Sequence, residues 1–414
     1  MFSELINRAN EDAANVISLG KIRLAMAKAG ISPAIYSDRN YYTTPIFTDG
    51  YTNGNGFPYL GVNGYSASSV YNPGNLMPET VTGKELGVEL RFWKNRFGID
   101  FTTYKQVTNN ILLSRPVSPS TGYQYVYQNS GKMQNKGIEL TLDMNVIKMK
   151  NINWNIGLTY TRNRNEVLEL ADGVKELSIE SGFAEIGSYA IVGQPYGVFY
   201  GTKWQRDAAT GKVLVDANGL PLVDPITGKL GDPNPKYLLG LSNSITIYGV
   251  NFSFLFDFRK GGDIWNGTYA RLNRIGRTEE SADRERTYVI DGIFAPGTPK
   301  AGMNNDAPIS ALNYYSRYVG DASGTSAAEN AIQDGSWVRL RSINLSYRFD
   351  FTKYTKHIQY IETFMTARNA WLRTKYKGVD PETSLTGAGS NINGYDYFNN
   401  PGTKSFLLGL RIGL

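Results

Sequence analysis

The chain has 414 residues, no cysteine, and 43 Lys and Arg against 37 Asp and Glu, which gives a formal net charge of +6. The absence of cysteine excludes disulfides, thiolate nucleophiles and thiolate metal ligands. Cations scattered among acids, without a basic cluster, argue against nucleic-acid binding. No apolar run approaches the ~18 residues that a spanning helix needs, so helical membrane insertion is also excluded.

The N-terminal sequence lacks a basic region followed by an apolar stretch, so no secretory signal peptide is visible. An exported protein needs such a signal. The expectation is therefore either a cytoplasmic protein or a mature or truncated piece whose Met1 is an internal methionine.

Strand patterns begin near the start of the chain. One strand contains Ile22, Leu24 and Met26, and an earlier one is expected within the first nine residues. Apolar and polar residues then alternate with the period of two that is typical of β-strands, over 85–92, 97–106, 136–146, 154–161, 237–247, 250–258, 337–349, 360–369 and 405–414. The pattern predicts an all-β, antiparallel fold of about ten or eleven strands.

Short and long connections alternate between these strands. The tightest short link is Tyr248-Gly249. The long connections are rich in Gly, Asn, Ser and Pro and cover about 30–84, 107–135, 162–236, 259–335 and 370–404. Outer-membrane barrels have short periplasmic turns and longer extracellular loops, so the alternation favours a transmembrane β-barrel.

Each strand has one apolar and one polar face. In a soluble sandwich the apolar faces meet a second sheet, whereas in a membrane barrel they meet lipid and the polar faces line a wet interior. A mean hydropathy of −0.34 is compatible with a barrel, because half of each strand faces water. The aromatic content of 13% is typical of strands with interfacial girdles. The predicted inward residues include Glu89, Arg91, Glu139, Asp143 and Asp257.

Two positions conflict with this alternation. Arg339 and Arg341 fall on the apolar side of the strand 337–349, where a cation at mid-membrane costs ~2–4 kcal/mol. Either both lie above the apolar band near lipid phosphates, or a bulge shifts the register. Asn243 falls on the apolar side of the strand 237–247, and its placement stays open.

Seven ordered motifs connect the chain to a known family. They are N-P-G-N-L-M-P-E from Asn72, K-E-L-G-V-E-L from Lys84, N-S-G-K-M-Q-N-K-G-I-E-L from Asn129, G-D-P-N-P-K-Y from Gly231, F-R-K-G-G-D-I-W-N from Phe258, D-G-S-W-V-R-L-R-S-I-N-L-S-Y from Asp334 and T-K-Y-K-G-V-D-P-E from Thr374. Together they resemble the C-terminal portion of SusC/RagA-type TonB-linked outer-membrane transporters of Bacteroidetes, over nearly the whole chain.

This resemblance implies the C-terminal half, residues 1–414, of a barrel of about 22 strands, without a plug domain. It further implies an outer-membrane location and uptake of an oligosaccharide or peptide. The implied partners are a SusD-like lipoprotein lid, outer-membrane lipid, a missing N-terminal plug and barrel half, and the TonB complex, reached through the missing part. An open sheet has two edges of unpaired backbone groups, which supports the interpretation as a fragment.

Aromatic side chains in the long connections are candidate ligand contacts, because they stack on sugar rings or pack on a lid protein. Internal packing of the loops is the alternative. The candidates are Tyr123, Tyr125, Tyr127, Trp204, Tyr314 and Tyr315, with Tyr318 close by. The first three share one strand face.

Other sites are weaker, and we expect no enzyme activity, no cofactor and no metal. His357 is the only histidine, so a triad or a multi-histidine metal site would depend on it alone. Carboxylate pairs such as Glu279-Glu280 and Asp380/Glu382 lack a spacing readable from sequence. The stretch from Asp216 to Asp224 departs from a calcium loop, and Asn218-Gly219 favours a hairpin turn instead.

Three rival interpretations remain open at this stage. In the first, the chain is a separate subunit of a split transporter. In the second, it is a soluble or surface glycan-binding β-protein whose apolar faces pack together. In the third, it is a cell-surface glycosidase. The identity of the substrate is not readable, because specificity depends on loop geometry.

Overall fold

The computed structural model describes residues 16–48, 53–183, 185–321, 324–355, 357–387, 390 and 392–414. Within these residues the largest sheet has ten long strands in the order β1-β7-β8-β9-β10-β16-β17-β23-β24-β26, and the short strand β6 also pairs with β9. All ten long strands are antiparallel to their neighbours. The predicted fold class and strand count are confirmed, while the strand expected in the first nine residues lies outside the described residues.

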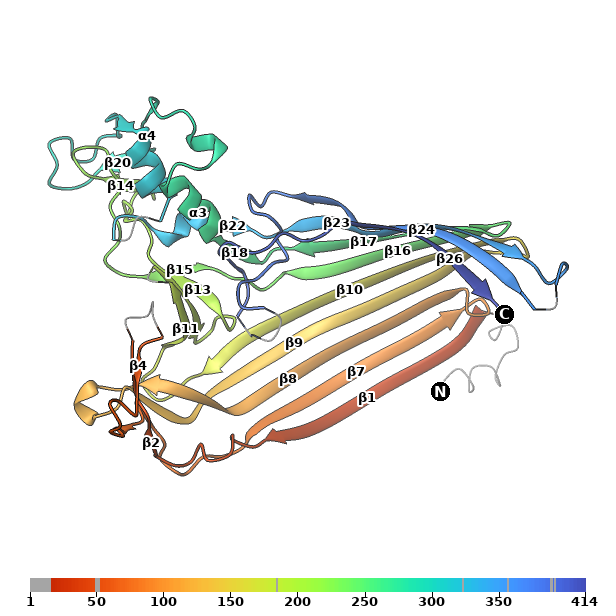
Figure 1. Cartoon of the computed structure of the whole chain (residues 1–414), viewed down its shortest axis with the longest axis horizontal. Helices are drawn as coiled ribbons and strands as arrows, with labels where there is room; N and C mark the ends of the chain where they lie inside the picture. Colours follow the sequence, from red (N-terminus) through yellow and green to blue (C-terminus); the bar gives the residue numbers. More distant parts are fainter. Residues whose placement is uncertain are drawn as a thin grey trace.

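The long strands agree in place with the alternating segments of the sequence. Their bounds are β1 (Ile17–Ile31), β7 (Glu79–Phe92), β8 (Phe97–Pro116), β9 (Tyr125–Lys148), β10 (Ile152–Glu169), β16 (Tyr237–Ile247), β17 (Val250–Lys260), β23 (Trp337–Asp350), β24 (Tyr360–Thr374) and β26 (Ser405–Gly413). In Figure 1 they lie side by side, with the short turns at one end and the long connections at the other. We call these the short-turn end and the long-loop end.

The turn between β16 and β17 shows why two residues are sufficient there. Tyr248 and Gly249 have φ values of 47° and 88°. Two consecutive positive φ angles are the geometry whose twist matches that of a two-residue antiparallel hairpin. A side chain at Gly249 would also lie 3.2 Å from the carbonyl oxygen of Arg348.

The loop predicted over 107–135 is wrong in its bounds. Strand β8 continues to Pro116 and β9 already begins at Tyr125, with register irregularities around Asn110 and Ile111. Similarly, β10 continues to Glu169. The predicted strands end where apolar residues stop alternating with polar ones. Backbone hydrogen bonds between neighbouring strands nevertheless continue above the apolar band, where both faces of the sheet are hydrated.

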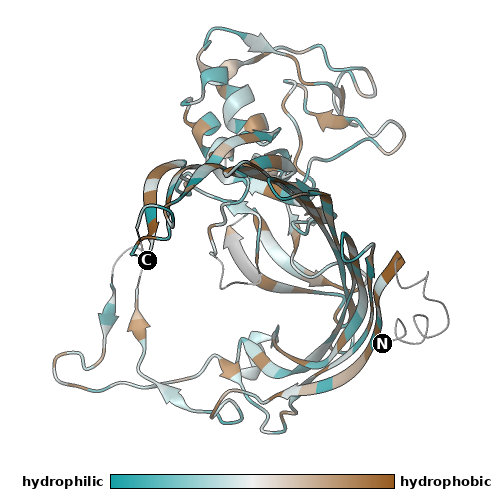
Figure 2. Cartoon of the chain, turned by 90° about the vertical axis from the view of Figure 1, so that its right-hand side faces the viewer, coloured by the Kyte–Doolittle hydropathy of each residue, from teal (hydrophilic) through white to brown (hydrophobic). Residues whose placement is uncertain are grey.

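Seen end-on, the sheet bends into an open trough whose edge strands are β1 and β26 (Figure 2). The apolar side chains of its outer face remain accessible rather than packed: Leu24 is 80% exposed and Leu408 85%. In a soluble sandwich a second sheet would cover such a face. The exposed apolar face contradicts that rival and fits a face that meets lipid.

A bulge in β23 resolves the conflict of the two arginines. The pairing of β23 with β24 and with β17 shifts between Leu340 and Ser342, so Arg341 is an extra residue in the strand. Beyond the bulge the alternation reverses, and Arg339 pairs with Asp257 of the inner face. Of the two explanations that the sequence left open, the bulge is correct. Asn243, by contrast, keeps its outward position between Ile156 and Phe254.

The hydrophobic core lies in a separate loop domain at the long-loop end, which we define as segments 170–236, 261–336 and 375–404 (Figure 1). One sheet of the domain consists of β11 (Glu176–Phe183), β12 (Ile186–Ile191), β13 (Val198–Gly201) and β15 (Gly228–Gly231). A second sheet consists of β22 (Ile332–Asp334), β18 (Asp263–Asn266) and β25 (Tyr395–Asp396). Two further pairs are β14 (Val213–Val215) with β20 (Gly292–Phe294), and β19 (Thr287–Tyr288) with β21 (Ile309–Ser310). The helices are α3 (Gly267–Arg274), α4 (Ala311–Asn313), η1 (Pro119–Thr121, outside the domain), η2 (Glu279–Ser281), η3 (Tyr314–Val319) and η4 (Ala328–Ala331).

The first long connection differs from the loop domain because its apolar residues stay exposed. It contains β2 (Tyr42–Thr43), β3 (Ile46–Phe47), β4 (Asn55–Gly56), β5 (Ser66–Ala67) and β6 (Val70–Tyr71). Tyr42 is 75% exposed and Leu60 88%. No helix of the described residues is long and apolar enough to cross a membrane.

The two faces of β17 give a direct test of the fold. Phe254 points outward near mid-height, and its neighbour Ser253 points inward to Ser244 and Asn344. Phe254→Lys should lower the free energy of unfolding in lipid vesicles by ~2–4 kcal/mol, because it places a cation in hydrocarbon. Ser253→Lys, the matched control, should change it by less than about 1 kcal/mol, since the lysine faces the wet side. Urea titration followed by tryptophan fluorescence measures both, and equal losses would contradict the assignment of faces.

Candidate functional site

The inner face of the trough carries a charged network near the short-turn end. Arg23 of β1 donates to Asp100 of β8 at 2.6 Å and lies 3.5 Å from Glu89 of β7. Arg91 pairs with Glu89 at 3.4 Å and, more closely, with Asp143 of β9. Cross-strand pairing places these side chains opposite one another. The predicted inward positions of Glu89, Arg91 and Asp143 are confirmed, and the network joins four strands.

Above this network the inner face carries neutral hydrogen-bonding groups. The hydroxyl of Tyr104 donates to Oδ1 of Asn163 at 3.2 Å, and the amides of Asn163 and Asn165 both donate to Oδ1 of Asn135, at 3.1 and 2.9 Å. Asn165 in turn accepts from the backbone N–H of Tyr196 in the loop domain at 2.8 Å. We call Tyr104, Asn135, Asn163 and Asn165 the amide ladder. Each side-chain amide has both a donor and an acceptor, so the ladder offers partners to hydroxyl- and amide-bearing ligands.

A hollow of about 620 Å³ lies beside the charged network. Its lining includes Gly157, the small hydroxyl side chains Ser242, Ser244, Ser253 and Ser342 on consecutive strands, and Arg91 and Asp143, together with the apolar residues Met144, Ile156, Phe254 and Leu255. Small side chains leave space between the wall and whatever occupies the interior. The inner face is therefore polar and recessed here.

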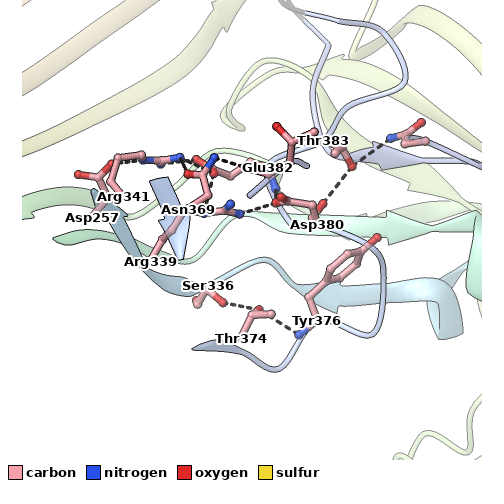
Figure 3. A network of polar contacts seen from close by, with 12 residues as sticks. Asp257, Ser336, Arg339, Arg341, Asn369, Thr374, Tyr376, Asp380, Glu382 and Thr383 are labelled. Atoms are coloured by element: carbon pink, nitrogen blue, oxygen red, sulfur yellow. Dashed lines mark hydrogen bonds and ion pairs between the residues drawn. The ribbon is translucent and has the colours of Figure 1, made fainter. Parts of the chain in front are cut away.

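The loop domain is fixed to the sheet by an arginine clamp, which we define as Arg339, Arg341, Asp257, Asp380 and Glu382 (Figure 3). Arg339 donates to Asp380 at 2.6 Å and pairs with Glu382 at 2.9 Å. Arg341 donates to Asp257 at 2.7 Å and to Glu382 at 2.8 Å. The bulge in β23 makes this arrangement, because it turns both guanidinium groups to the inner side.

The clamp is buried at its centre. The side chains of Arg339 and Asp380 are 5% and 8% exposed, and both guanidinium groups also lie over the ring of Trp337, at 5.6 and 5.5 Å from its centroid. A desolvated ion pair of this kind is strongly destabilised when one partner is lost, because the remaining charge stays buried. The clamp thus holds the segment after β24 against the top of β23.

The same segment is held a second time by Tyr376. Its hydroxyl hydrogen-bonds to Asp396, whose other oxygen accepts from Thr268 at 2.9 Å. Burial, and then the hydrogen bond to Asp396, raise the pKa of Tyr376 above its usual value. Nearby, Lys377 pairs with Glu280 at 2.6 Å, and this contact lowers the pKa of Glu280. The T-K-Y-K-G-V-D-P-E motif therefore supplies the contacts that join the loop domain to the barrel wall.

The predicted ligand aromatics do not form one site. Tyr125 is 40% exposed at the start of β9, and Tyr123 lies beside Tyr71, with ring centroids 5.1 Å apart. Tyr127, further along β9, is half-buried. Tyr125 and Tyr71 present exposed rings at the long-loop end.

Trp204 and Tyr315 are buried in the interior of the loop domain, and Tyr314 is half-buried beside Tyr315. Trp204 is 1% exposed, and its indole N–H donates to Asn330 at 3.0 Å. Tyr315 is 8% exposed, and Tyr314 stacks on Tyr288 at 4.0 Å. The rings of Trp204 and Tyr315 are therefore internal packing, the alternative that the sequence left open, because a ligand needs an accessible ring face.

The remaining candidates have structural explanations. His357 is exposed in the turn after β23. The carboxylates of Glu280, Asp380 and Glu382 are engaged by cations, as described above. Asp216 accepts backbone N–H groups of Asn218 and Leu220, at 2.8 and 2.9 Å, which is the predicted hairpin turn. No group of three or more metal-ligating side chains occurs among the described residues.

Sequence reasoning missed the arginine clamp and the amide ladder. The clamp had a readable signal, the reversal of alternation in R-L-R of β23, but its partner Asp380 lies 41 residues from Arg339. Two members of the ladder are contained in R-N-R-N from Arg162, where Asn163 and Asn165 alternate with outward arginines. The alternation of amides with cations in the sequence therefore indicates that the amides lie on one face of the strand and the arginines on the other.

The clamp predicts a large difference between two acidic residues. Asp380→Ala should lower the free energy of unfolding of the loop domain by ~3–5 kcal/mol, because it leaves Arg339 buried without its partner. Glu280→Gln, the control, removes an ion pair that is about half exposed and should cost no more than ~1 kcal/mol. Hydrogen exchange of segment 375–404 reports both. Comparable protection of the two variants would contradict the structural role of the clamp.

Comparison with known proteins agrees with this geometry. The family model described as TonB dependent receptor-like, beta-barrel matches residues 36–207. TonB-dependent receptor P3 of Formosa agariphila is 27% identical over 383 residues, which cover 85% of this chain and 36% of that protein. TonB-dependent receptor SusC of Bacteroides thetaiotaomicron is 24% identical, with coverage of 96% and 38%.

Solved structures show the same fold. The RagAB peptide transporter superimposes with a TM-score of 0.68 at 19% identity, over 98% of this chain and 42% of that one. In the open-open state of the RagAB peptide importer the TM-score is 0.69. The chain spans between 36% and 39% of the length of the curated relatives that it matches. The resemblance found in the sequence is confirmed: the chain is related to the SusC/RagA-type TonB-dependent receptors and carries part of their outer-membrane β-barrel fold.

Proposed function

We propose that this chain supplies barrel wall and extracellular loops to a TonB-dependent importer that takes up oligosaccharides or peptides. The main support is the two-sided sheet: an exposed apolar outer face, a polar and recessed inner face, and a loop domain clamped to one end. Such a wall separates lipid from a hydrated interior through which a polar solute can pass.

The proposed substrate class fits the chemistry of the inner face. The amide ladder and the small hydroxyl side chains are neutral and carry both donors and acceptors, which suits the hydroxyl groups of sugars and the backbone of peptides. Among the similar proteins, RagAB is described as a peptide transporter. Both substrate classes therefore stay in the proposal.

Several partners follow from the proposed function. A SusD-like lipoprotein is proposed to cover the long-loop end, and a plug domain and further barrel strands to complete the lumen. Edge strands β1 and β26 require such completion, because unpaired backbone groups cost several kcal/mol each in hydrocarbon. Energy coupling through the TonB complex is assigned to the plug-bearing part.

The proposed role is transport without catalysis. Of the carboxylates considered as glycosidase pairs, Glu280, Asp380 and Glu382 are bound to lysine or arginine in the structure, so neither pair offers two free carboxyl groups. A glycosidase would need one carboxyl group to hold a proton near neutral pH. The hydrogen bond from Lys377 instead lowers the pKa of Glu280.

Deletion of the gene tests the proposal. The deletion strain should lose growth on either an oligosaccharide mixture or a peptide mixture as the limiting nutrient, while growth on free monosaccharides and amino acids is retained. Complementation with the intact gene should restore growth. Uptake of fluorescent oligosaccharides and peptides by whole cells then separates the two classes. Unchanged growth and uptake for both mixtures would contradict the importer function.

A further inference from the structure

On the adjacent strands β1, β7, β8, β9 and β10, six cations share the outer, lipid-facing side of the sheet: Lys28, Lys84, Lys105, Lys136, Arg162 and Arg164. We call them the cation belt. Lys84 is opposite Lys105, Lys105 is opposite Lys136, and Lys136 is opposite Arg164 on the adjacent strands β7, β8, β9 and β10. Lys84, Lys105 and Lys136 are exposed. They share the outward face with Leu86 and Ile138, two positions along the same strands.

This arrangement is unfavourable without an anion. Adjacent strands lie about 4.8 Å apart, and like charges placed directly opposite each other destabilise a sheet. None of the ion pairs among the described residues includes a residue of the cation belt. The neighbouring acid on β10, Glu166, accepts a hydrogen bond from Gln134 at 2.7 Å. The arginine clamp, in contrast, has carboxylate partners within its own chain.

Lys105 of the cation belt lies near the upper edge of the apolar band. On β8, Lys105 is eight residues from Phe97, which lies at the short-turn end. This separation is about 27 Å along the strand. At the usual tilt of ~40° it corresponds to roughly 20 Å in height. The apolar band of outer-membrane barrels is about 25 Å tall and ends in aromatic girdles. Phe97 packs with Phe92 and Trp93 at the lower edge, and Tyr160 with Tyr237 at the upper edge, at a centroid distance of 5.5 Å.

An apolar hollow on the same face is lined in part by three of these lysines. It has a volume of about 760 Å³, and its lining includes Leu24, Met26 and Leu86 together with Lys84, Lys105 and Lys136. Leu24 and Met26 are 80% and 73% exposed. Lysine stems lie along apolar surface while their ammonium groups reach toward the polar layer. The hollow thus combines space for hydrocarbon with a row of cations at one end.

We propose that the cation belt and this hollow bind a phosphorylated lipid of the outer leaflet. The phosphate lies between the ammonium groups of Lys84, Lys105 and Lys136, and an acyl chain lies against Leu24, Met26 and Leu86. Each lysine contributes a compact charge with three donors, which suits phosphate oxygens. Bound phosphate neutralises the repulsion between opposite lysines. The site is on the outside of the barrel and is independent of the import route.

Native mass spectrometry of the protein in non-ionic detergent tests the site, with monophosphoryl lipid A as the probe. The variant Lys84→Gln/Lys105→Gln/Lys136→Gln should bind this lipid about tenfold more weakly or worse, since each lysine near an anionic surface adds to the affinity. The control variant Lys94→Gln/Lys148→Gln/Lys150→Gln removes the same charge at the short-turn end and should bind like the unaltered protein. Lipid A without its phosphate should bind the unaltered protein as weakly as the belt variant binds the phosphorylated lipid.

Three results would overturn the proposal. They are equal binding by the belt variant and the control variant, equal binding of the phosphorylated and dephosphorylated lipids, and competition by inorganic phosphate as effective as competition by the lipid. Thermal unfolding without lipid checks that the belt variant is folded, and it should be at least as stable as the unaltered protein because the like charges are gone. If it does not fold, Lys105→Gln alone should weaken binding about threefold.

Discussion

Strict alternation of side chains across one continuous sheet determines the rest of this structure. A strand places successive residues on opposite faces, so a single register decides which solvent each residue meets. Apart from a few bulges, ten neighbouring strands keep this alternation, and apolar residues of their outer face are exposed. The polar inner face, the loop domain and the cation belt all take their position from it.

The bulge at Leu340–Ser342 shows how the chain uses one of its local exceptions to this alternation. Without it, Arg339 and Arg341 would lie on the lipid face, where cations are costly. With it, both reach inward to Asp257, Asp380 and Glu382 and fix the loop domain to the wall. One additional residue in one strand therefore converts an unfavourable position into the attachment point of a domain. The outward lysines of the cation belt have no such exception, which is why we assign them an external anion.

The sequence was sufficient for the strands but not for the loop domain. Period-two alternation located the strands because each residue's environment depends only on its neighbours along the chain. The link Tyr248-Gly249 was readable for the same reason. Burial of Trp204 and Tyr315 depends on contacts with residues such as Asn330 and Tyr288, far away or in other segments, so their exposure was not readable. The strand extensions to Pro116 and Glu169 were missed because backbone pairing, rather than apolar patterning, carries them beyond the membrane.

The central claim is that hydrocarbon, and not protein, touches the apolar face. The chain has no native cysteine, so single cysteines introduced one at a time along 137–146 of β9 report cleanly on their own surroundings. Spin labels at these positions in lipid vesicles, relaxed by oxygen from the lipid phase and by a nickel chelate from water, should alternate with a period of two. Ile138, Leu140, Leu142 and Met144 are predicted to be accessible to oxygen, and Glu139, Thr141 and Asp143 to the nickel chelate. Positions shielded from both reagents on the apolar side would show a dry protein interior and contradict the account.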